Sequence, residues 1–188
     1  MTFMEQGVID ETMCQTTLKP DGGKLMICEI DDSQYDDSLE TVAEVGLAYV
    51  HCSFKGTLID GKASYLLDSV TTGFSSSYNS VKKFLQNLSD IKLVKNSLQG
   101  SVTGTFECEV PPTFKVSMSD RFNDKLPQDA IRLDNMRNGT CLLRICGYTN
   151  FPRRYNHNWI DGGSFIRRVS LVCKYDSNHK QVAKQSSN

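Results

Sequence analysis

Val102-Thr-Gly-Thr-Phe-Glu-Cys-Glu-Val110 alternates apolar and polar side chains along its length. Val102, Phe106, Cys108 and Val110 share one phase, whereas the threonines and glutamates share the other. A period of two indicates a β-strand with one buried face. The alternation along residues 102–110 therefore predicts a strand of an antiparallel sheet that has one face toward water.

Strand patterns also occur on both sides of this stretch. Upstream, one phase carries the apolar side chains Ala48, Val50, Cys52, Phe54 and Leu58, and Asp60-Gly61 marks a tight turn. Downstream, three further stretches predict strands, at residues 113–118, 140–148 and 165–175. In the last of these, one apolar phase holds Phe165, Val169, Leu171 and Cys173.

One helix is predicted after Ser75-Ser-Ser77, which offers an N-cap. Its apolar side chains recur at helical spacing, at Val81, Phe84, Leu85, Leu88 and Ile91. The fold class is therefore α+β, with a mainly antiparallel β-sheet or sandwich core and one packed amphipathic helix.

Charge divides the sequence after Val50. Residues 1–50 hold 11 acids against Lys19 and Lys24, a net charge of −9, and the remaining 138 residues carry a net charge of +8. We interpret residues 1–44 as an acidic, largely flexible arm with a short edge strand at 24–30, residues 45–175 as the globular domain, and residues 176–188 as a polar tail. Such asymmetry favours an interaction role, in which the arm binds the basic body of the same or another copy. The alternative is that the arm only maintains solubility.

The seven cysteines show no pairing signal. Their number is odd, no CxxC pair occurs, and Met1 to Glu11 lacks the basic and apolar regions of a secretory leader. No apolar run is long enough to span a membrane. We therefore expect free, buried thiols in a protein made in the cytosol.

Catalytic and metal-binding motifs are not recognisable. His51 and Cys52 are neighbours on a predicted strand, so their side chains point to opposite faces. Cys141 and Cys146 have opposite strand parity, which disfavours a zinc site. Asp31, Asp32, Asp36 and Asp37 lack EF-hand spacing. We predict no catalytic residue, no metal and no cofactor, and hence a protein that is not an enzyme.

The connection at residues 150–163 is the strongest candidate for a binding surface. It combines aromatic and basic side chains, which can stack on bases, enter a lipid headgroup layer or fill a protein pocket. The alternative is that Trp159 only fixes the loop to the sheet. The candidate contact residues in and around this connection, with a second group on and after the helix, are Phe151, Arg153, Arg154, Tyr155, Trp159, Arg167, Arg168, Lys82, Lys83, Lys92 and Lys95.

The order of elements resembles the core of rhabdovirus matrix proteins, especially the short ones of plant-infecting members. The residues that carry the resemblance are Tyr49–Ile59 followed by the helix at 78–88, and the stretch from Glu109 to Met118 followed by residues 140–148. The resemblance covers residues 46–150. The acidic arm and the sequence Pro111-Pro112-Thr113-Phe114 both depart from that family's pattern.

The resemblance implies a virion and host-cytoplasm protein that self-associates from arm to body through Asp31, Asp32, Asp36 and Asp37. Its partners would be itself, a viral nucleocapsid or RNA, and an anionic membrane surface. The alternative is a plant-virus movement protein or silencing suppressor that binds single-stranded RNA. A cellular β-sandwich adaptor is a third hypothesis.

Overall fold

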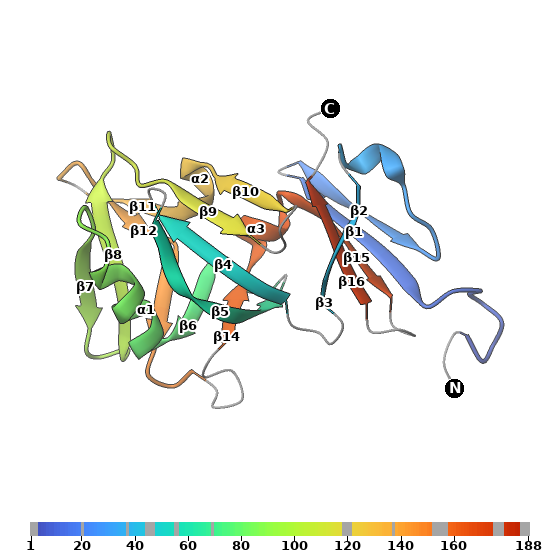
Figure 1. Ribbon diagram of the computed structural model, residues 1–188, viewed down its shortest axis with the longest axis horizontal. Helices are drawn as coiled ribbons and strands as arrows, with labels where there is room; N and C mark the ends of the chain where they lie inside the picture. The colour runs from blue at the N-terminus through green and yellow to red at the C-terminus, as the bar shows by residue number, and fades with distance from the viewer. Residues whose placement is uncertain are drawn as a thin grey trace. The chain divides into compact units, whose positions relative to one another are not determined.

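The computed structural model describes residues 4–19, 21–36, 38–43, 48–54, 57–68, 70–117, 122–136, 138–151, 158–174 and 179–184. The chain folds into two compact units (Figure 1). The first unit combines Met1–Ala48 with Ile166–Asn188, and the second unit is Tyr49–Phe165. Both ends of the sequence therefore belong to the first unit.

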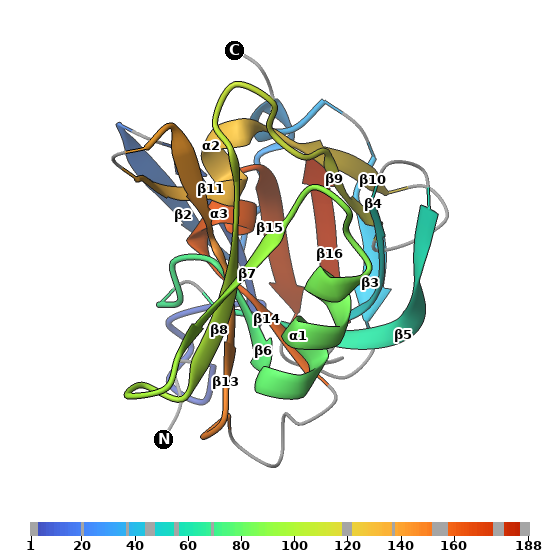
Figure 2. The same ribbon diagram turned by 90° about the vertical axis from the view of Figure 1, so that its left-hand side faces the viewer.

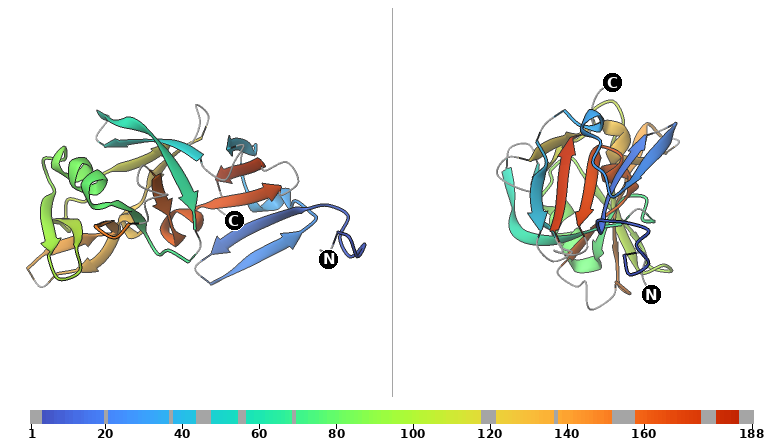
Figure 3. Two further views of the ribbon diagram at one scale, coloured as in Figure 1. Left: turned by 90° about the horizontal axis from the view of Figure 1, so that it is seen from below. Right: turned by 90° about the vertical axis from the view of Figure 1, so that its right-hand side faces the viewer.

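The first unit is built on a five-stranded antiparallel sheet in the order β2-β1-β15-β16-β3. Its strands are β1 (Met13–Lys19), β2 (Gly22–Ile27), β3 (Glu40–Ala43), β15 (Val169–Lys174) and β16 (His179–Lys184). A short 3-10 helix, η1 (Asp32–Gln34), lies between β2 and β3 along the chain. In the right-hand view of Figure 3, the orange-red pair β15 and β16 lies between the blue strands β1 and β2 on one side and β3 on the other.

Strand β1 corrects the interpretation of residues 1–44 as a flexible arm. Its residues pair with β2 on one side and with β15 on the other. Met13, Gln15 and Thr17 are buried on alternate positions, as expected for a strand with one covered face. The N-terminal segment is thus held by strand pairing to residues more than 150 positions away in the sequence.

The second unit is built on an eleven-stranded mixed sheet in the order β10-β9-β4-β5-β14-β6-β13-β8-β12-β11, with β7 also paired to β8. The bounds of its strands are β4 (Ala48–Phe54), β5 (Thr57–Leu67), β6 (Phe74–Ser77), β7 (Lys92–Asn96), β8 (Ser101–Glu107), β9 (Phe114–Ser117), β10 (Asn123–Leu126), β11 (Arg132–Asn135), β12 (Thr140–Leu143), β13 (Ile145–Tyr148) and β14 (Asn158–Asp161).

Helix α1 (Tyr78–Gln86) confirms the predicted helix. The Ser77 hydroxyl accepts a hydrogen bond from the Ser80 amide at 3.2 Å and so caps the first turn. Val81, Phe84 and Leu85 are buried where the helix packs on β6, β8 and β13 (Figure 2). The other helices of the described part, α2 (Gln128–Ile131) and α3 (Gly163–Ile166), have four residues each, and none of the three is long and apolar enough to cross a membrane.

Two glycines of the sheet bring α1 close to it. A Cβ at Gly147 of β13 would lie 2.8 Å from Val81 Cβ, and one at Gly104 of β8 would lie 2.3 Å from Ile91 Cγ2. Carbon atoms in contact normally stand about 3.5–4.0 Å apart. The helix and the turn after it therefore occupy space that any larger residue would fill.

A disulfide joins Cys108, after β8, to Cys141 of β12. This bond shows that the expectation of free thiols was wrong for these two residues. Cys28 and Cys146 are free thiols. The cysteine pattern failed as a signal because 33 positions separate the bonded pair in sequence, whereas β8 and β12 are neighbours in the sheet.

The β-rich α+β class is confirmed, but three predicted strands have different bounds. β8 ends at Glu107, before the disulfide. The single strand expected at 140–148 is two strands, because the Arg144 amide donates to Ile131 O at 2.7 Å and leaves the ladder. In the strand expected at 165–175, the first residues form α3. In β15, Val169, Ser170 and Val172 are buried, whereas Leu171 and Cys173 of the expected phase are half-buried.

Candidate functional site

In the second unit, strand β14 lies between two strands that follow each other in the chain. Residues 68–73 connect β5 to β6, yet β14 separates these strands in the sheet and pairs parallel with β5 and antiparallel with β6. Leu67 and Phe74 both lie opposite Asp161 in this register. We call residues 66–75 together with 158–164 the threaded junction.

Backbone hydrogen bonds fix the connecting loop of the threaded junction at both ends. At the end of β5, the Asp68 amide donates to Asp161 O at 2.9 Å. At the other end, the amides of Gly162 and Gly163 donate to Gly73 O and Thr71 O at 3.0 and 2.7 Å. Because these bonds pair the loop with the residues around β14, the position of the loop depends on how β14 is seated.

Gly162 and Gly73 make the close backbone approach in the junction possible. A Cβ at Gly162 would lie 2.1 Å from Thr71 O, and a Cβ at Gly73 would lie 2.6 Å from Arg144 O. Both distances are well below van der Waals contact, and backbone atoms cannot swing aside as a side chain can. The junction therefore requires glycine at both positions.

The loop presents one carboxyl group, that of Asp68. Its Oδ1 accepts the Val70 amide at 3.0 Å, and its Oδ2 accepts the Thr71 hydroxyl at 2.7 Å. Hydrogen bonds to a carboxylate are charge-assisted and fix its orientation. Asp68 is half-buried, whereas the Val70 side chain is 89% exposed. The group can thus be reached from solvent in a loop that its own hydrogen bonds hold.

A second carboxyl group, that of Asp161, lies in the same junction in a different environment. The residue is completely buried, and neither carboxyl oxygen has a hydrogen-bond partner among the residues that the structure describes. Burial raises the pKa of Asp161 well above its ordinary value, because an unpaired charge is costly away from water. Asp68 and Asp161 are thus neighbours through their backbones, but only Asp68 faces solvent.

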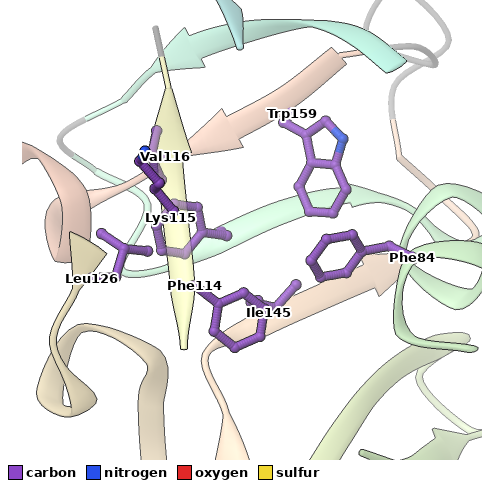
Figure 4. Close-up of a pocket in the computed structure, with 8 residues that line it drawn as sticks. Phe84, Phe114, Lys115, Val116, Leu126, Ile145 and Trp159 are labelled. Atoms are coloured by element: carbon purple, nitrogen blue, oxygen red, sulfur yellow. The ribbon is translucent and has the colours of Figure 1, made fainter. Parts of the chain in front are cut away.

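A small apolar pocket lies beside β14 (Figure 4). Phe84 packs edge-on against Trp159 with ring centroids 5.5 Å apart, and it stacks on Phe114 at 6.0 Å. The cavity has a volume of about 20 Å³, roughly the room for one water molecule. It is a packing gap of the core, too small to hold a substrate side chain.

Comparison with known proteins now assigns the family. The family model described as eukaryotic aspartyl protease matches residues 1–185. The chain belongs to the eukaryotic aspartyl protease family. A curated relative from Malassezia globosa, named "Probable inactive secreted aspartyl protease", is 55% identical over 184 residues, which are 98% of this chain and 47% of the relative. The chain therefore spans about half the length of that relative.

Membership in the aspartyl protease family overturns the viral hypotheses. A family model that covers nearly the whole chain replaces a pattern-level resemblance to rhabdovirus matrix proteins. The matrix function, the movement-protein and silencing-suppressor alternative, the nucleocapsid, RNA and membrane partners, and the virion and host-cytoplasm location were wrong. The resemblance misled because an order of strands and one helix is common to many β-rich folds, whereas pairing order is not visible in a sequence.

Of the predicted aromatic contact residues, the structure describes Phe151 and Trp159, and both pack into the second unit. Trp159 is half-buried on β14 and packs on Phe84, and Phe151 is buried. These positions agree with the alternative that Trp159 has a structural role. Arg153, Arg154 and Tyr155 lie outside the described residues.

The predicted basic contact residues are distributed over three elements. Lys82 and Lys83 are on α1, Lys92 and Lys95 are on β7, and Arg167 and Arg168 follow α3. Lys92 and Lys95 have opposite strand parity, so they point to opposite faces of β7. A contact role for these side chains stays a prediction.

The predicted acidic residues of the arm find partners in their own segment. Asp31 Oδ2 lies 2.5 Å from Lys24 Nζ, and Asp32 accepts a hydrogen bond from the Tyr35 hydroxyl. Burial, with the Asp32 hydrogen bond, raises the pKa of Tyr35 to about 12. Asp36 is exposed, and Asp37 lies outside the described residues. Asp31 and Asp32 thus pair within their own segment, and a contact of these acids with a basic body stays a prediction.

Asp68, Thr71 and Asp161 were not among the predicted site residues. Each aspartate does have a sequence signal, because it directly follows apolar strand residues, Leu66-Leu67 in one case and Trp159-Ile160 in the other. A carboxyl at the end of a strand is a candidate for function, since loops at strand ends often carry it. The sequence could not show that these two strand ends lie side by side.

Proposed function

We propose that this chain is a non-hydrolysing aspartyl-protease-type module of a secreted protein, and that its Asp68 loop binds peptide. The observation that supports the proposal is the unequal exposure of the two carboxyls of the threaded junction. Asp68 is half-buried, whereas Asp161 is completely buried. The name of the relative, which calls that protein inactive and secreted, agrees with the non-hydrolysing and secreted character in the proposal.

The chemistry of aspartic proteases explains why unequal exposure matters. These enzymes use two aspartate carboxyls about 3 Å apart that share one proton. Both groups must face the scissile bond, so a carboxyl sealed in the core cannot take part. The hydrogen bonds to the Asp68 carboxyl come from Val70 and Thr71 of its own loop. We therefore expect the loop to keep this conformation and to hold a peptide without hydrolysing it.

Peptide binding is the role that remains for the exposed part of the loop. Val70 offers an apolar side chain that is 89% exposed, and the Asp68 carboxylate can accept a hydrogen bond from a peptide amide. An apolar contact beside an oriented acceptor is the usual composition of a peptide contact. A secreted protein also suits the Cys108–Cys141 disulfide, because such bonds persist in oxidising compartments.

The test is a paired assay of cleavage and binding. Purified chain is incubated with denatured casein between about pH 3 and pH 7, and the products are followed by mass spectrometry. We expect no cleavage beyond that seen with Asp68→Asn. Cleavage by the wild type that is lost in Asp68→Asn would overturn the non-hydrolysing part of the proposal.

Binding is measured by the fluorescence anisotropy of labelled casein peptides. Val70→Ser should weaken binding several-fold, whereas Leu98→Ser should leave it unchanged, because Leu98 is 99% exposed in a turn remote in sequence from the loop. Equal affinities of the wild type and Val70→Ser would remove the Asp68 loop as the binding site.

A second candidate is a peptidase whose other carboxyl lies outside this chain. The observation that favours it is the coverage of 47% of the relative, which leaves half of that protein without a counterpart here. The same Asp68→Asn comparison, made in a longer form that includes such a half, decides between the candidates. Cleavage that depends on Asp68 in the longer form supports the peptidase.

A further inference from the structure

The threaded junction contains an unpartnered acid at its centre. Asp161 is the last residue of β14, and its backbone lies between Leu67 of β5 and Phe74 of β6. Within the described part of the chain, its two carboxyl oxygens are buried without a hydrogen-bond partner, and so is the Ser164 hydroxyl three residues later. Native proteins leave few buried polar groups unpaired, so a buried, unpaired carboxyl group is unusual and needs a physical reason.

We propose that Asp161 is a pH-sensitive lock, which holds the threaded junction closed in acid while the carboxyl is protonated and loosens it when the proton leaves. A neutral carboxylic acid costs little in an apolar site compared with a carboxylate, whose charge must be paired or hydrated. The proposal is independent of the proposed function, since it concerns the seating of β14 and not what the loop binds.

The charged groups on the surrounding elements do not neutralise Asp161. They are Asp68 at the end of β5, Arg144 beside Phe74, and Arg167 and Arg168 after α3; β6 and α3 carry none within their bounds. β5 also carries Asp60 and Lys62, seven and five positions before Leu67, the residue opposite Asp161. The Arg144 guanidinium donates to Arg132 O at 3.0 Å and is thus engaged elsewhere. Burial is accordingly the cause of the raised pKa of Asp161, with no opposing attraction from a cation.

The sign of the effect follows from the direction of the shift. In the unfolded chain the pKa of an aspartate is about 3.9. In the folded protein the pKa of Asp161 lies well above this ordinary value. Between these two values only the folded state holds the proton. The stabilisation is therefore complete below about pH 4 and is lost as the pH rises, with about a tenfold gain in the unfolding equilibrium constant per pH unit.

Loosening at Asp161 would be transmitted directly to the Asp68 loop. The Asp161 carbonyl holds the Asp68 amide, and the next two amides hold Gly73 O and Thr71 O. When a charged Asp161 moves toward water, these bonds break together because they lie on consecutive residues. The position of the Asp68 carboxyl thus becomes dependent on pH through a residue that does not touch a ligand.

The experiment compares urea unfolding of the full chain from about pH 4 to pH 8 with that of three variants. Asp161→Asn keeps the shape of the side chain without its titration, and Asp161→Leu replaces it with an apolar group. Asp134→Asn, on the exposed strand β11, is the control for the loss of one carboxyl. We expect the free energy of unfolding of the wild type and of Asp134→Asn to fall steeply as the pH rises. That of the two Asp161 variants should fall less.

Asp161→Leu gives the sharper expectation, because at about pH 7 it should unfold less readily than the wild type, and this advantage should vanish near about pH 4. Parallel pH dependences of the wild type and both Asp161 variants would overturn the proposal. Should the variants not fold, infrared spectroscopy of the wild type labelled at aspartate carboxyl carbons is the second measurement. A protonated carboxyl at about pH 6 supports the lock, and its absence overturns it.

Discussion

Gln15 joins three segments of the first unit through a single side-chain amide. Its Nε2 donates to Ser170 Oγ at 2.7 Å, and its Oε1 accepts the Asp31 amide at 2.6 Å. The residue is 1% exposed, so water cannot replace these partners. A buried polar group that is fully paired specifies one arrangement of the chain around it. Gln15 thereby fixes β1, β15 and the segment before η1 in register.

Gln15→Ala should destabilise the protein by about 1–3 kcal/mol, because it removes the side-chain acceptor of the Asp31 amide and leaves the buried Ser170 hydroxyl with Thr17 Oγ1 as its remaining side-chain partner. Urea unfolding followed by circular dichroism measures the change. Gln6→Ala, at an exposed position of the same unit, is the matched control and should change stability little. Equal midpoints for the two variants would contradict the role assigned to Gln15.

Asp31 shows how the N-terminal acids are stabilised locally. A hydrogen bond from Lys24 is the largest cause that holds the pKa of Asp31 below its ordinary value, and the Ser33 hydroxyl and amide add to it. A lowered pKa in the folded state means that the stabilisation exists above about pH 4 and is lost as the pH falls further. Its sign is thus opposite to that of Asp161.

Lys24→Gln should raise the pKa of Asp31 toward its ordinary value, since the cationic donor is removed. Carboxyl-carbon NMR of Asp31 during an acid titration measures the shift. Lys83→Gln, an exposed lysine on α1, should not move the Asp31 titration. An unchanged Asp31 titration in Lys24→Gln would show that the serine hydrogen bonds suffice.

At the scale of elements, α1 was predictable because all of its signals are local. The serine cap and the apolar spacing lie within about 15 residues, and the structure uses both. The divided strand at 140–148 was not predictable, because its cause is distant. The Arg144 amide leaves the ladder for Ile131 O, and the Arg144 carbonyl accepts the Phe74 amide at 2.9 Å. Apolar alternation continues through such a break, so the pattern alone reads as one strand.

Gly147→Ala tests how closely α1 packs on the sheet. The added Cβ would lie 2.8 Å from Val81 Cβ and 3.0 Å from the Tyr78 Cα, so the helix must move outward. We expect a loss of about 1–3 kcal/mol, as for other overpacked cores. Thermal unfolding measures it. Gly139→Ala is the control for a new methyl without a clash, although its positive φ of 76° adds backbone strain of its own. A larger loss at Gly139 than at Gly147 would contradict close packing of α1.

At the scale of the molecule, the candidate site was hidden because it is made by pairing order. Asp68 and Asp161 lie 93 positions apart in the sequence, and only the insertion of β14 between β5 and β6 brings them together. The charge split after Val50 is a real property of the sequence, yet it does not imply an arm. The net charge of a segment determines how it interacts with water and ions. The folding of β1 depends instead on the burial of alternate side chains and on its pairing with neighbouring strands.

The Cys108–Cys141 disulfide connects the secreted character of the relative to the stability of the second unit. It joins the end of β8 to β12 and closes a loop across 33 positions. In the chain-entropy model a loop of this size stabilises the folded state by about 3–4 kcal/mol. The disulfide should therefore contribute much of the margin that a domain of this size has over unfolding.

A double variant, Cys108→Ala with Cys141→Ala, should lower the free energy of unfolding by about 2–4 kcal/mol. The reducing agent dithiothreitol should lower the free energy of unfolding of the wild type by a similar amount and leave that of the double variant unchanged. Cys146→Ala, which removes a free thiol of β13 in the same unit, should not alter the response to the reductant. Mass spectrometry after alkylation verifies the oxidised state, with Cys108 and Cys141 protected only before reduction. If dithiothreitol destabilises the double variant as much as the wild type, the stabilisation does not come from this disulfide, and the link between an oxidising compartment and the fold of the second unit fails.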